Sequence, residues 1–510
     1  MSIHQHVADL VEYASIHLSL DEADRLYSRN ALYNLLNVHT DEDVTVDRAA
    51  LSALEVPDTL LTPLSDYAVQ NGIIEEEYRA LFETALMGTV TMKPSEVNRK
   101  FEADIKALGV RKALLNFYDQ SIKSNYIKMT DVKRNLWWLH ECDGAPLEIT
   151  VNLSKPEKDN KEIARLKAMP ATGFPKCMLC KENVNYQGRL NFPARQTLRF
   201  VPLTLNGERW YMQYSPYVYY NEHCIVFSEQ HAPMTMNRTT FIKFADFVDT
   251  FPCYMIGSNA CIPIVGGSIL THEHYQGGEH VMPMHHAKPV YHFTHERFPE
   301  VDICITDWYN SNIRLITKNR EQMIDAAEYI FNFWQEYSDE SVGVIARTTE
   351  GHNAVTPILR KLEDGTYSLD MLLRNNRTDE TYPDGIFHAH PEYHNIKKEG
   401  IGLIEAMGLF ILPGRLQKES AGIAEYLTGK RTDKDYLDEA NVLYKHRGMI
   451  EELIASAGTA CTDEQADKLI KAYIGGVCRK ILDNTAVFKK DEKGVKAFFT
   501  FMEKAGFKRV

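Results

Sequence analysis

Residues 266–278 read GGSILTHEHYQGG, and this stretch gives the clearest indication of the fold. The opening glycines permit a tight turn or a close approach of the backbone to a ligand. Threonine, tyrosine and the apolar residues just before the glycines favour a strand that leaves this turn. Side chains alternate along a strand, so His272, His274 and Gln276 are predicted to share one face. The same pattern also fits a polar strand face with surface histidines.

An H-x-H-x-Q strand after a Gly-Ser turn resembles the histidine-triad superfamily, in particular its nucleotidyl-transferring branch. The motif THEHYQGG, together with the segment QYSPYVYYNEHCIVFSEQHAPM at residues 213–234, resembles the sequences of the class II galactose-1-phosphate uridylyltransferases. The resemblance runs over most of the chain and is densest at residues 125–416. Glu273 stands between the two histidines, where the class I enzymes have a proline.

This resemblance implies an α/β (α+β) fold with two histidine-triad-like half-domains that contain antiparallel sheets, and with helical N- and C-terminal regions. Apolar spacings of three and four residues near the N-terminus, and the helix-start pattern at Thr462, agree with helical ends. We therefore expect four parts: a helical region at 1–124, the catalytic half-domain at 125–300, a second half-domain at 301–418 and a helical region at 419–510.

Length and composition restrict the class of protein. The chain has 510 residues with 44% hydrophobic and 25% charged residues, as in soluble globular proteins of more than one domain. Its net charge of -13 argues against a nucleic-acid-binding protein that neutralises phosphates. The sequence shows neither the ~18–20 apolar residues of a membrane helix nor the pattern of a signal peptide. Nine scattered cysteines favour free thiols in a reducing compartment, so we expect a cytoplasmic protein without nucleic-acid or membrane partners.

Cys177 and Cys180 form a C-x-x-C pair, which in a cytosolic protein is either a redox pair or half of a zinc site. The residues GFP before the pair and the segment 183–188 after it suggest a knuckle turn, which favours a metal. The resemblance to class I uridylyltransferases implies that His231 and His272 complete a closed Cys₂His₂ site for a structural zinc. The alternative is two buried thiols and two hydrogen-bonded histidines. We expect no organic cofactor.

The chemistry of histidine suits the transfer of a nucleotidyl group. A neutral imidazole has a free lone pair near pH 7 and attacks phosphorus without a separate general base. A sugar phosphate leaves as an anion without a strong general acid, so a histidine nucleophile suits the exchange of hexose 1-phosphates. We predict His274 as this nucleophile, with a backbone carbonyl on its other ring nitrogen. Gln276, Ser268 and the backbone at Gly267 are predicted to hold phosphoryl oxygens.

Other cationic and polar side chains are predicted to contact the substrate. Lys128 and Arg134 alternate with aromatic residues, and this combination is suited to binding a diphosphate together with a base or sugar ring. A solvent-exposed junction between a helix and a strand has the same pattern. Arg195 lies near a tyrosine cluster that either holds uracil, ribose or phosphate or forms the core of a sheet. Asn259 precedes the central strand and is a candidate for a backbone-organising or a phosphate contact.

His388 and His390 repeat the H-x-H pattern in the second half of the chain. The sequence predicts a strand here, with both histidines on one face. The resemblance implies two related half-domains, of which the first keeps the nucleophile. Three interpretations of this pair stay open: a second metal site, a contact to the hexose phosphate that makes both residues substrate-binding, or packing.

The resemblance implies a UDP-glucose:hexose-1-phosphate uridylyltransferase of the Leloir pathway, which acts through a uridylyl-His274 intermediate. The expected partners are therefore a UDP-hexose and a hexose 1-phosphate, and the helical regions allow a homodimer. One alternative is another histidine-triad nucleotidyltransferase or a dinucleoside-polyphosphate phosphorylase. A second alternative is a zinc- or nucleotide-binding protein without catalysis, against which the presence of both His274 and Gln276 argues.

Overall fold

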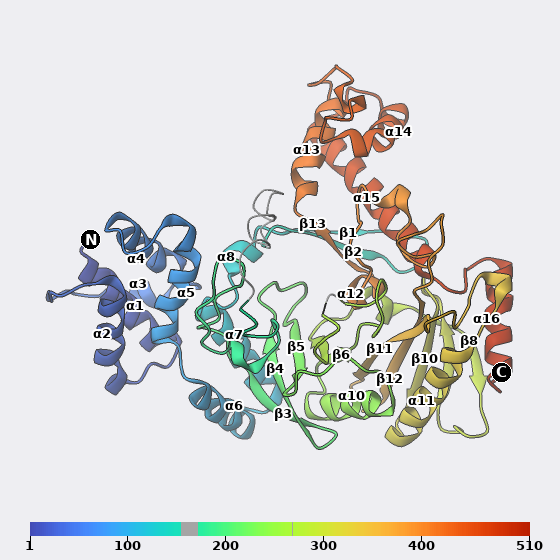
Figure 1. Cartoon of the computed structure of the whole chain (residues 1–510), viewed down its shortest axis with the longest axis horizontal. Coiled ribbons are helices and arrows are strands. Elements are labelled where there is room, and N and C mark those ends of the chain that lie inside the picture. The colour runs from blue at the N-terminus through green and yellow to red at the C-terminus, as the bar shows by residue number, and fades with distance from the viewer. Residues whose placement is uncertain (155–171, 268) are drawn as a thin grey trace. The chain divides into compact units, whose positions relative to one another are not determined.

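The computed structural model describes residues 1–154, 172–267 and 269–510, and it shows a mixed α/β fold with helical N- and C-terminal regions (Figure 1). Its sheets are built mainly from antiparallel pairs, as the sequence analysis predicted. The predicted phosphate contact of Ser268 lies outside the described residues. Among the helices of these ranges, none combines the length and apolar content needed to cross a membrane.

Two compact units make up the chain. The first contains residues 1–134 and 172–232, and the second contains residues 135–154 and 233–510. The expected division into four parts therefore stays a prediction, and each unit is described below by itself.

The first unit begins with a helical bundle. Ser2 accepts a hydrogen bond from Gln5 N at the start of the first helix, and Asp47 caps a later helix in the same way. One face of each main helix contributes to a common apolar core, which includes Leu10, Leu64 and Leu86. The helices are α1 Ile3–His17, α2 Arg25–Leu36, α3 Arg48–Ser52, α4 Asp58–Gln70 and α5 Arg79–Val90.

Within its described residues, the rest of the first unit contains three further α-helices and three strands. Strands β3, β4 and β5 are joined in antiparallel pairs, and α6 packs on α7 and contacts β3. The bounds are α6 Pro94–Leu108, α7 Val110–Lys123, α8 Met129–Val132, β3 Val201–Leu205, β4 Glu208–Tyr214 and β5 Cys224–Ser228.

The second unit is built on a long antiparallel sheet with the order β14-β8-β9-β10-β12-β11-β6-β7. The central strands β11 and β12 are almost completely buried, which explains their high apolar content. The strands are β6 Met255–Gly257, β7 His274–Gly278, β8 Pro289–Thr294, β9 Asp302–Thr306, β10 Asn312–Thr317, β11 Asn353–Lys361, β12 Tyr367–Asn375 and β14 Lys508–Arg509.

Two amphipathic helices cover this sheet. Helix α10, Arg238–Thr250, packs on β6 and β11, and α11, Arg320–Glu336, packs on β10, β11 and β12. The two helices also contact each other, so they lie on the same face of the sheet (Figure 1). Asn319 caps α11 by accepting a hydrogen bond from Gln322 N.

A second, three-stranded sheet in this unit has the order β1-β2-β13. Strands β1, Leu136–His140, and β2, Leu147–Asn152, are antiparallel, whereas β13, Leu409–Pro413, runs parallel to β2. The short helix α12, Leu403–Ala406, leads into β13.

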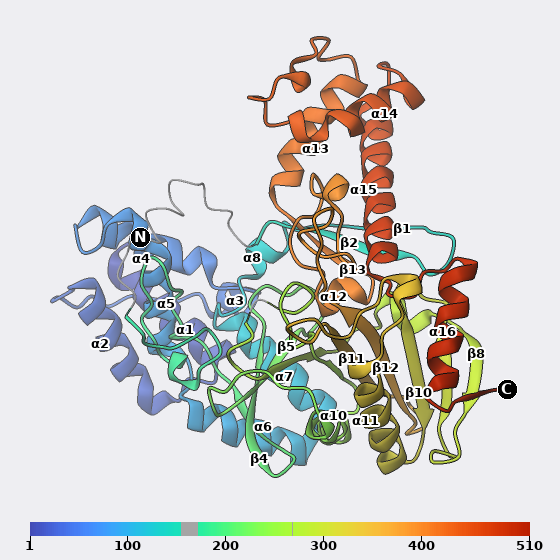
Figure 2. The same ribbon diagram turned by 45° about the vertical axis from the view of Figure 1, so that its right-hand side comes forward.

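Helices α13, α14 and α15 of the C-terminal region pack on one another, and α15 reaches the three-stranded sheet. Helix α15 contacts α13, α14 and strands β1 and β2, and Figure 2 shows it running from the α13–α14 region to that sheet. Thr462 caps α15 through a reciprocal hydrogen-bond pair with Gln465, as the sequence predicted. The bounds are α13 Arg415–Leu427, α14 Arg447–Ala457, α15 Asp463–Thr485 and α16 Glu492–Lys504.

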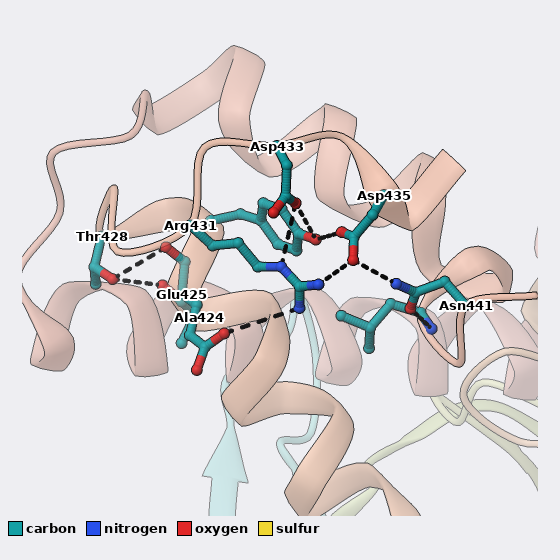
Figure 3. Close-up of polar contacts among 9 residues, drawn as sticks. Ala424, Glu425, Thr428, Arg431, Asp433, Asp435 and Asn441 are labelled. Atoms are coloured by element: carbon teal, nitrogen blue, oxygen red, sulfur yellow. Dashed lines mark hydrogen bonds and ion pairs between the residues drawn. The ribbon is translucent and has the colours of Figure 1, made fainter. Parts of the chain in front are cut away.

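Arg431 organises the loop that follows α13 (Figure 3). Its guanidinium pairs with the carboxylates of Asp433 and Asp435, and the hydroxyl of Tyr426 also donates to Asp435. Asn441 Nδ2 donates to the second oxygen of Asp435 at 2.9 Å. These contacts hold the loop on its helix and fit a structural role.

The structure corrects two strand predictions. The strand predicted around the first H-x-H begins only at His274, because the carbonyl of His272 bonds to the ring of His274 instead of a neighbouring strand. Residues 386–390 form a turn rather than a strand. His390 Nε2 bonds back to Ile386 O at 3.0 Å, and Gly385 has a φ of 117°, which favours glycine.

Candidate active site

A backbone carbonyl next to His274 fixes the tautomer of its ring. Its side chain is buried, and Nδ1 lies 2.8 Å from the carbonyl oxygen of His272. A carbonyl oxygen only accepts hydrogen bonds, so Nδ1 carries the proton and Nε2 keeps its lone pair. The structure therefore contains the carbonyl contact that the sequence analysis expected for a histidine nucleophile.

The surroundings of His274 favour its neutral form. Burial lowers the pKa of His274 below its ordinary value, and the hydrogen bond to the His272 carbonyl opposes this effect only in part. Gln276 follows two positions later in the same strand and is half-buried, so it shares a strand face with His274. This face of β7 presents a neutral imidazole beside an amide.

The opposite face of the same segment carries a buried ion pair. Glu273 Oε1 lies 3.3 Å from Lys243 Nζ of α10 and accepts a hydrogen bond from the Tyr275 hydroxyl at 2.7 Å. All three side chains are buried. A buried charge is stable only when it is paired and hydrogen-bonded, so these contacts fix the position of the backbone between the two histidines.

The turn before the catalytic segment has room only for glycine. A Cβ added at Gly267 would lie 2.8 Å from Asn259 Nδ2, and one added at Gly266 would lie 2.3 Å from Ala260 O. Asn259 Oδ1 also accepts a hydrogen bond from Leu403 N at 2.8 Å. Asn259 thus organises the backbone, which is one of the two roles predicted for it, while its phosphate contact and that of Gly267 stay predictions.

Cys177 and Cys180 form the predicted knuckle turn. Asn183 Nδ2 donates to the carbonyl oxygens of both cysteines at 2.8 Å, and Leu179 N donates to Cys177 Sγ at 3.4 Å. The two sulfur atoms lie 3.6 Å apart. All nine cysteines of the chain lie in the described ranges, and none of them forms a disulfide.

These cysteines belong to a group of four candidate metal ligands, Cys177, Cys180, His231 and His272, whose ligand atoms lie within 4.8 Å of one another. Cys180 Sγ and His231 Nδ1 are 3.1 Å apart. Bonds of ~2.3 Å to sulfur and ~2.1 Å to nitrogen place the ligand atoms of a tetrahedral zinc roughly 3.3–3.8 Å apart, so the group is compatible with zinc. Burial raises the pKa of the Cys180 thiol to about 11, so a bound cation would be needed to keep it as a thiolate near pH 7.

His388 and His390 have separate partners. His388 Nε2 accepts a hydrogen bond from Ile401 N at 3.0 Å, whereas the ring of His390 stacks on Tyr382 with 4.0 Å between the ring centres. Within the described ranges, the group at the knuckle is the one set of three or more side chains placed to hold a metal. The second H-x-H pair therefore gains no support as a metal site.

The three predicted basic contacts of the first unit differ in exposure. Arg134 is largely exposed and lies 3.5 Å from Asp131, so its position is that of a solvated side chain. Lys128 is half-buried at the start of α8. Arg195 is buried with its guanidinium 5.7 Å from the centre of the Tyr126 ring. Arg195 and Tyr126 thus form a cation–aromatic pair, and the nucleotide contacts of the three basic residues stay predictions.

Comparison with known proteins assigns the family. The model of the N-terminal domain of galactose-1-phosphate uridyl transferase matches residues 19–233, and that of the C-terminal domain matches residues 247–439. The chain belongs to the galactose-1-phosphate uridylyltransferase family. The comparison with solved structures found no match.

Curated relatives within this family match the chain from end to end. A galactose-1-phosphate uridylyltransferase of Caldanaerobacter subterraneus subsp. tengcongensis is 48% identical over 99% of this chain and 98% of its own length. Those of Fusobacterium nucleatum subsp. nucleatum and Bacillus subtilis are 44% and 42% identical and cover 99% and 100% of this chain, each over 99% of its own length. The resemblance seen in the sequence motifs therefore extends over the whole uridylyltransferase chain.

Sequence reasoning missed Lys243 in this uridylyltransferase-family site. The residue lies on α10, 30 positions before its partner Glu273, and in the sequence it is one of several charged residues on that helix. The available signal was the glutamate itself, because an acid next to the predicted nucleophile requires a partner if the strand is buried.

Proposed function

We propose that the protein transfers the uridylyl group from UDP-glucose to galactose 1-phosphate, giving UDP-galactose and glucose 1-phosphate. The carrying observation is the hydrogen bond between His274 Nδ1 and His272 O, which leaves Nε2 as a buried, neutral nucleophile in a chain of this family. The full-length similarity to curated uridylyltransferases supports the same substrates.

In the first half-reaction, the lone pair of His274 Nε2 attacks the phosphorus of the uridylyl group of UDP-glucose. A P–N bond forms and the P–O bond to glucose 1-phosphate breaks, so that glucose 1-phosphate leaves with the electron pair. The positive charge that develops on the imidazole is stabilised through Nδ1–H by the carbonyl dipole of His272. In the second half-reaction, a phosphate oxygen of galactose 1-phosphate attacks the same phosphorus and the P–N bond breaks.

Further side chains complete the proposal. Gln276 donates to a phosphoryl oxygen as charge shifts, and it cannot protonate a leaving group, which favours transfer over hydrolysis. Gly267 and Ser268 supply phosphate contacts at the turn, and Lys128, Arg134 and Arg195 contact the nucleotide. His388 and His390 belong to the hexose-phosphate side of the site.

A structural zinc at Cys177, Cys180, His231 and His272 is part of this proposal, and it is supported by the donor set and the spacing of the ligand atoms. When bound, such a metal would stabilise the fold around the knuckle and hold thiolates, and it takes no part in the transfer. The reaction needs no organic cofactor. The four-part division, a cytoplasmic location and a homodimer are retained as predictions.

A coupled assay tests the function. Purified protein given UDP-glucose and galactose 1-phosphate should release glucose 1-phosphate, which phosphoglucomutase and a dehydrogenase convert to a reduced nicotinamide signal. Efficient turnover of diadenosine polyphosphates without turnover of UDP-sugars would indicate the phosphorylase alternative. Substrate binding without turnover of either class would indicate a binding protein.

A further inference from the structure

Arg374, near the end of β12, is a fully buried arginine that uses only part of its hydrogen-bonding capacity. It is 0% exposed, and its Nη2 donates to Ile401 O at 2.7 Å. Its Nε and Nη1 are buried and lack a hydrogen-bond partner in the described structure. Arg374 is the one side chain of the described ranges with two nitrogens in this situation. Buried donors of a charged group are expected to have acceptors, so a ligand is implied.

His388 adds a third donor beside the same peptide. Ile401 N donates to His388 Nε2 at 3.0 Å, so Nε2 is an acceptor and the proton of the neutral ring lies on Nδ1. That Nδ1 is also buried and without a partner among the described residues. Arg374 and His388 thus bind the carbonyl and the amide of one residue, and both retain unused N–H groups.

The buried side chains around Ile401 carry more positive than negative charge. Lys397 Nζ lies 2.9 Å from Glu405 Oε1 and donates to Ile411 O, so the one buried carboxylate nearby is already paired with a buried lysine. Glu405 is also the acidic group that acts on Arg374, so two buried cations share one carboxylate.

Acidic side chains nearer the surface do not neutralise this excess positive charge. Asp384, the other acidic group that influences His388, is more than half exposed and lies 4.0 Å from His394. Bridging water would satisfy the free N–H groups of Arg374 but would leave the excess charge in place, and a metal ion would add to the excess.

The segment that leads to Ile401 runs from the surface and lies near the turn that precedes His274. Ile401 is buried, whereas the residues just before it, 398–400, are exposed. A Cβ added at Gly400 would lie 3.5 Å from Ile264 O, and one added at Gly385 would lie 3.1 Å from the Ile264 side chain. Ile264 is two residues before the glycine pair, so this region borders the catalytic turn.

We propose that Arg374 and His388 form a receptor for a tetrahedral oxyanion of the phosphate class. An arginine with two free N–H groups and a neutral imidazole N–H supply directed donors, and the anion pairs the charge of Arg374. The oxyanion is either the phosphate group of a sugar 1-phosphate or free inorganic phosphate. The first source rests on the proposed function, whereas the receptor itself does not.

Two variants remove donors while they keep the bonds to Ile401. Arg374→Lys retains a cation that reaches the carbonyl but loses Nε–H and Nη1–H. His388→Met retains a weak acceptor for the amide in its thioether sulfur but has no N–H group. Arg360→Lys is the matched control, because Arg360 also donates to a backbone carbonyl and has a single unpartnered Nε.

Equilibrium dialysis with radiolabelled inorganic phosphate at constant ionic strength tests the receptor. The wild type and Arg360→Lys should bind phosphate with equal affinity, and Arg374→Lys and His388→Met should each bind about tenfold more weakly or worse. Circular dichroism verifies that each variant is folded, and if Arg374→Lys is not folded, His388→Met decides the test. Phosphate binding that is absent from the wild type, or unchanged in the folded variants, would overturn the proposal.

Competition identifies the source of the oxyanion. Galactose 1-phosphate that displaces the label, with a raised KM for both galactose 1-phosphate and UDP-glucose in Arg374→Lys, assigns the receptor to the substrate, because the sugar phosphate occupies the same position in both half-reactions. If galactose 1-phosphate does not displace the labelled phosphate, the receptor is assigned to free inorganic phosphate. Phosphate binding by a protein that fails the coupled assay would reject the proposed function and leave the receptor standing.

Discussion

Lys243 Nζ lies 3.3 Å from Glu273 Oε1, and this buried ion pair is made one residue away from the proposed nucleophile His274. The class I enzymes have a proline at the position of Glu273, and proline restricts the backbone through its ring. This chain restrains the same backbone position through a side chain that is bound to α10. The pair therefore fixes the carbonyl of His272, which in turn sets the tautomer of His274.

Replacing Glu273 by Gln tests this positioning role. The substitution would remove the carboxylate from the buried ion pair with Lys243, and breaking such a pair costs on the order of 3–5 kcal/mol of unfolding free energy. We expect a lower urea midpoint and a slower single-turnover formation of the uridylyl-enzyme. The double variant Lys243→Met with Glu273→Gln should recover most of the stability and little of the rate. Equal recovery of both would show that the pair acts on stability alone.

The two histidines of the first H-x-H should respond differently to substitution by asparagine. His274→Asn should abolish both half-reactions and leave the thermal midpoint nearly unchanged, because it removes the reacting nitrogen. His272→Asn should lower stability or metal content, because a lost ligand or an unpaired buried group costs about 1–3 kcal/mol. Incubation with UDP-glucose labelled in the uridylyl phosphate should leave acid-labile, base-stable label on the wild type. Label that persists in His274→Asn would reverse the assignment.

Metal content tests the four-ligand group. Purified protein should hold about one zinc per chain, and Cys177→Ser should reduce this content, because a closed site with four protein ligands binds zinc tightly. Cys304→Ser is a suitable control, since Cys304 is a buried free thiol outside the group. Metal analysis that finds a fully active protein without metal would leave the cysteines as packing thiols.

The pH dependence of the first half-reaction should reflect the lowered pKa of His274. Burial disfavours the imidazolium, so the ring stays neutral and nucleophilic below its ordinary pKa of 6.5. The rate of uridylyl-enzyme formation under subsaturating UDP-glucose should therefore be constant from about pH 8 to 6.5 and should fall only at lower pH. A midpoint at or above 6.5 would contradict this assignment.

Glu419 should contribute to acid stability. Burial by itself would raise its pKa, but hydrogen bonds from His446 and Lys445 and the charge of Arg415 lower it to about 2. Because the folded pKa is below the unfolded value near 4.5, the stabilisation is present above pH ~4.5 and is lost as the pH falls towards 2. Glu419→Gln should destabilise the protein by about 3–5 kcal/mol at neutral pH and flatten the urea-midpoint profile over this range. A profile as steep as that of the wild type would contradict this account.

Local rules were sufficient for several features of the site. The cap at Thr462 and the knuckle at Cys177 follow from residues within a few positions of one another. The shared face of His274 and Gln276 follows from the period of a strand. Such features need no knowledge of the remaining chain, and the sequence analysis predicted them correctly.

Features that depend on a side chain bonding to the backbone, or to a side chain of another element, could not be predicted in the same way. The carbonyl of His272 bonds to a ring two residues later, which delays the start of β7. His390 bonds back to Ile386 O, and this contact closes a turn where a strand was predicted. The pairing of Lys243 with Glu273 likewise depends on how α10 lies over the sheet.

The parallel pairing of β2 with β13 has a consequence for biosynthesis. Glu148 is paired with Leu409, so one edge of the β1–β2 hairpin receives its partner only after roughly 260 further residues, or about 13–52 s of synthesis at ~5–20 residues per second. During that interval the unpaired edge of β2 is exposed to other nascent chains, and long-range parallel pairing is intrinsically slow. The hairpin therefore emerges from the ribosome long before the strand that covers its edge is synthesised. A chaperone that covers strand edges would increase the yield of folded enzyme.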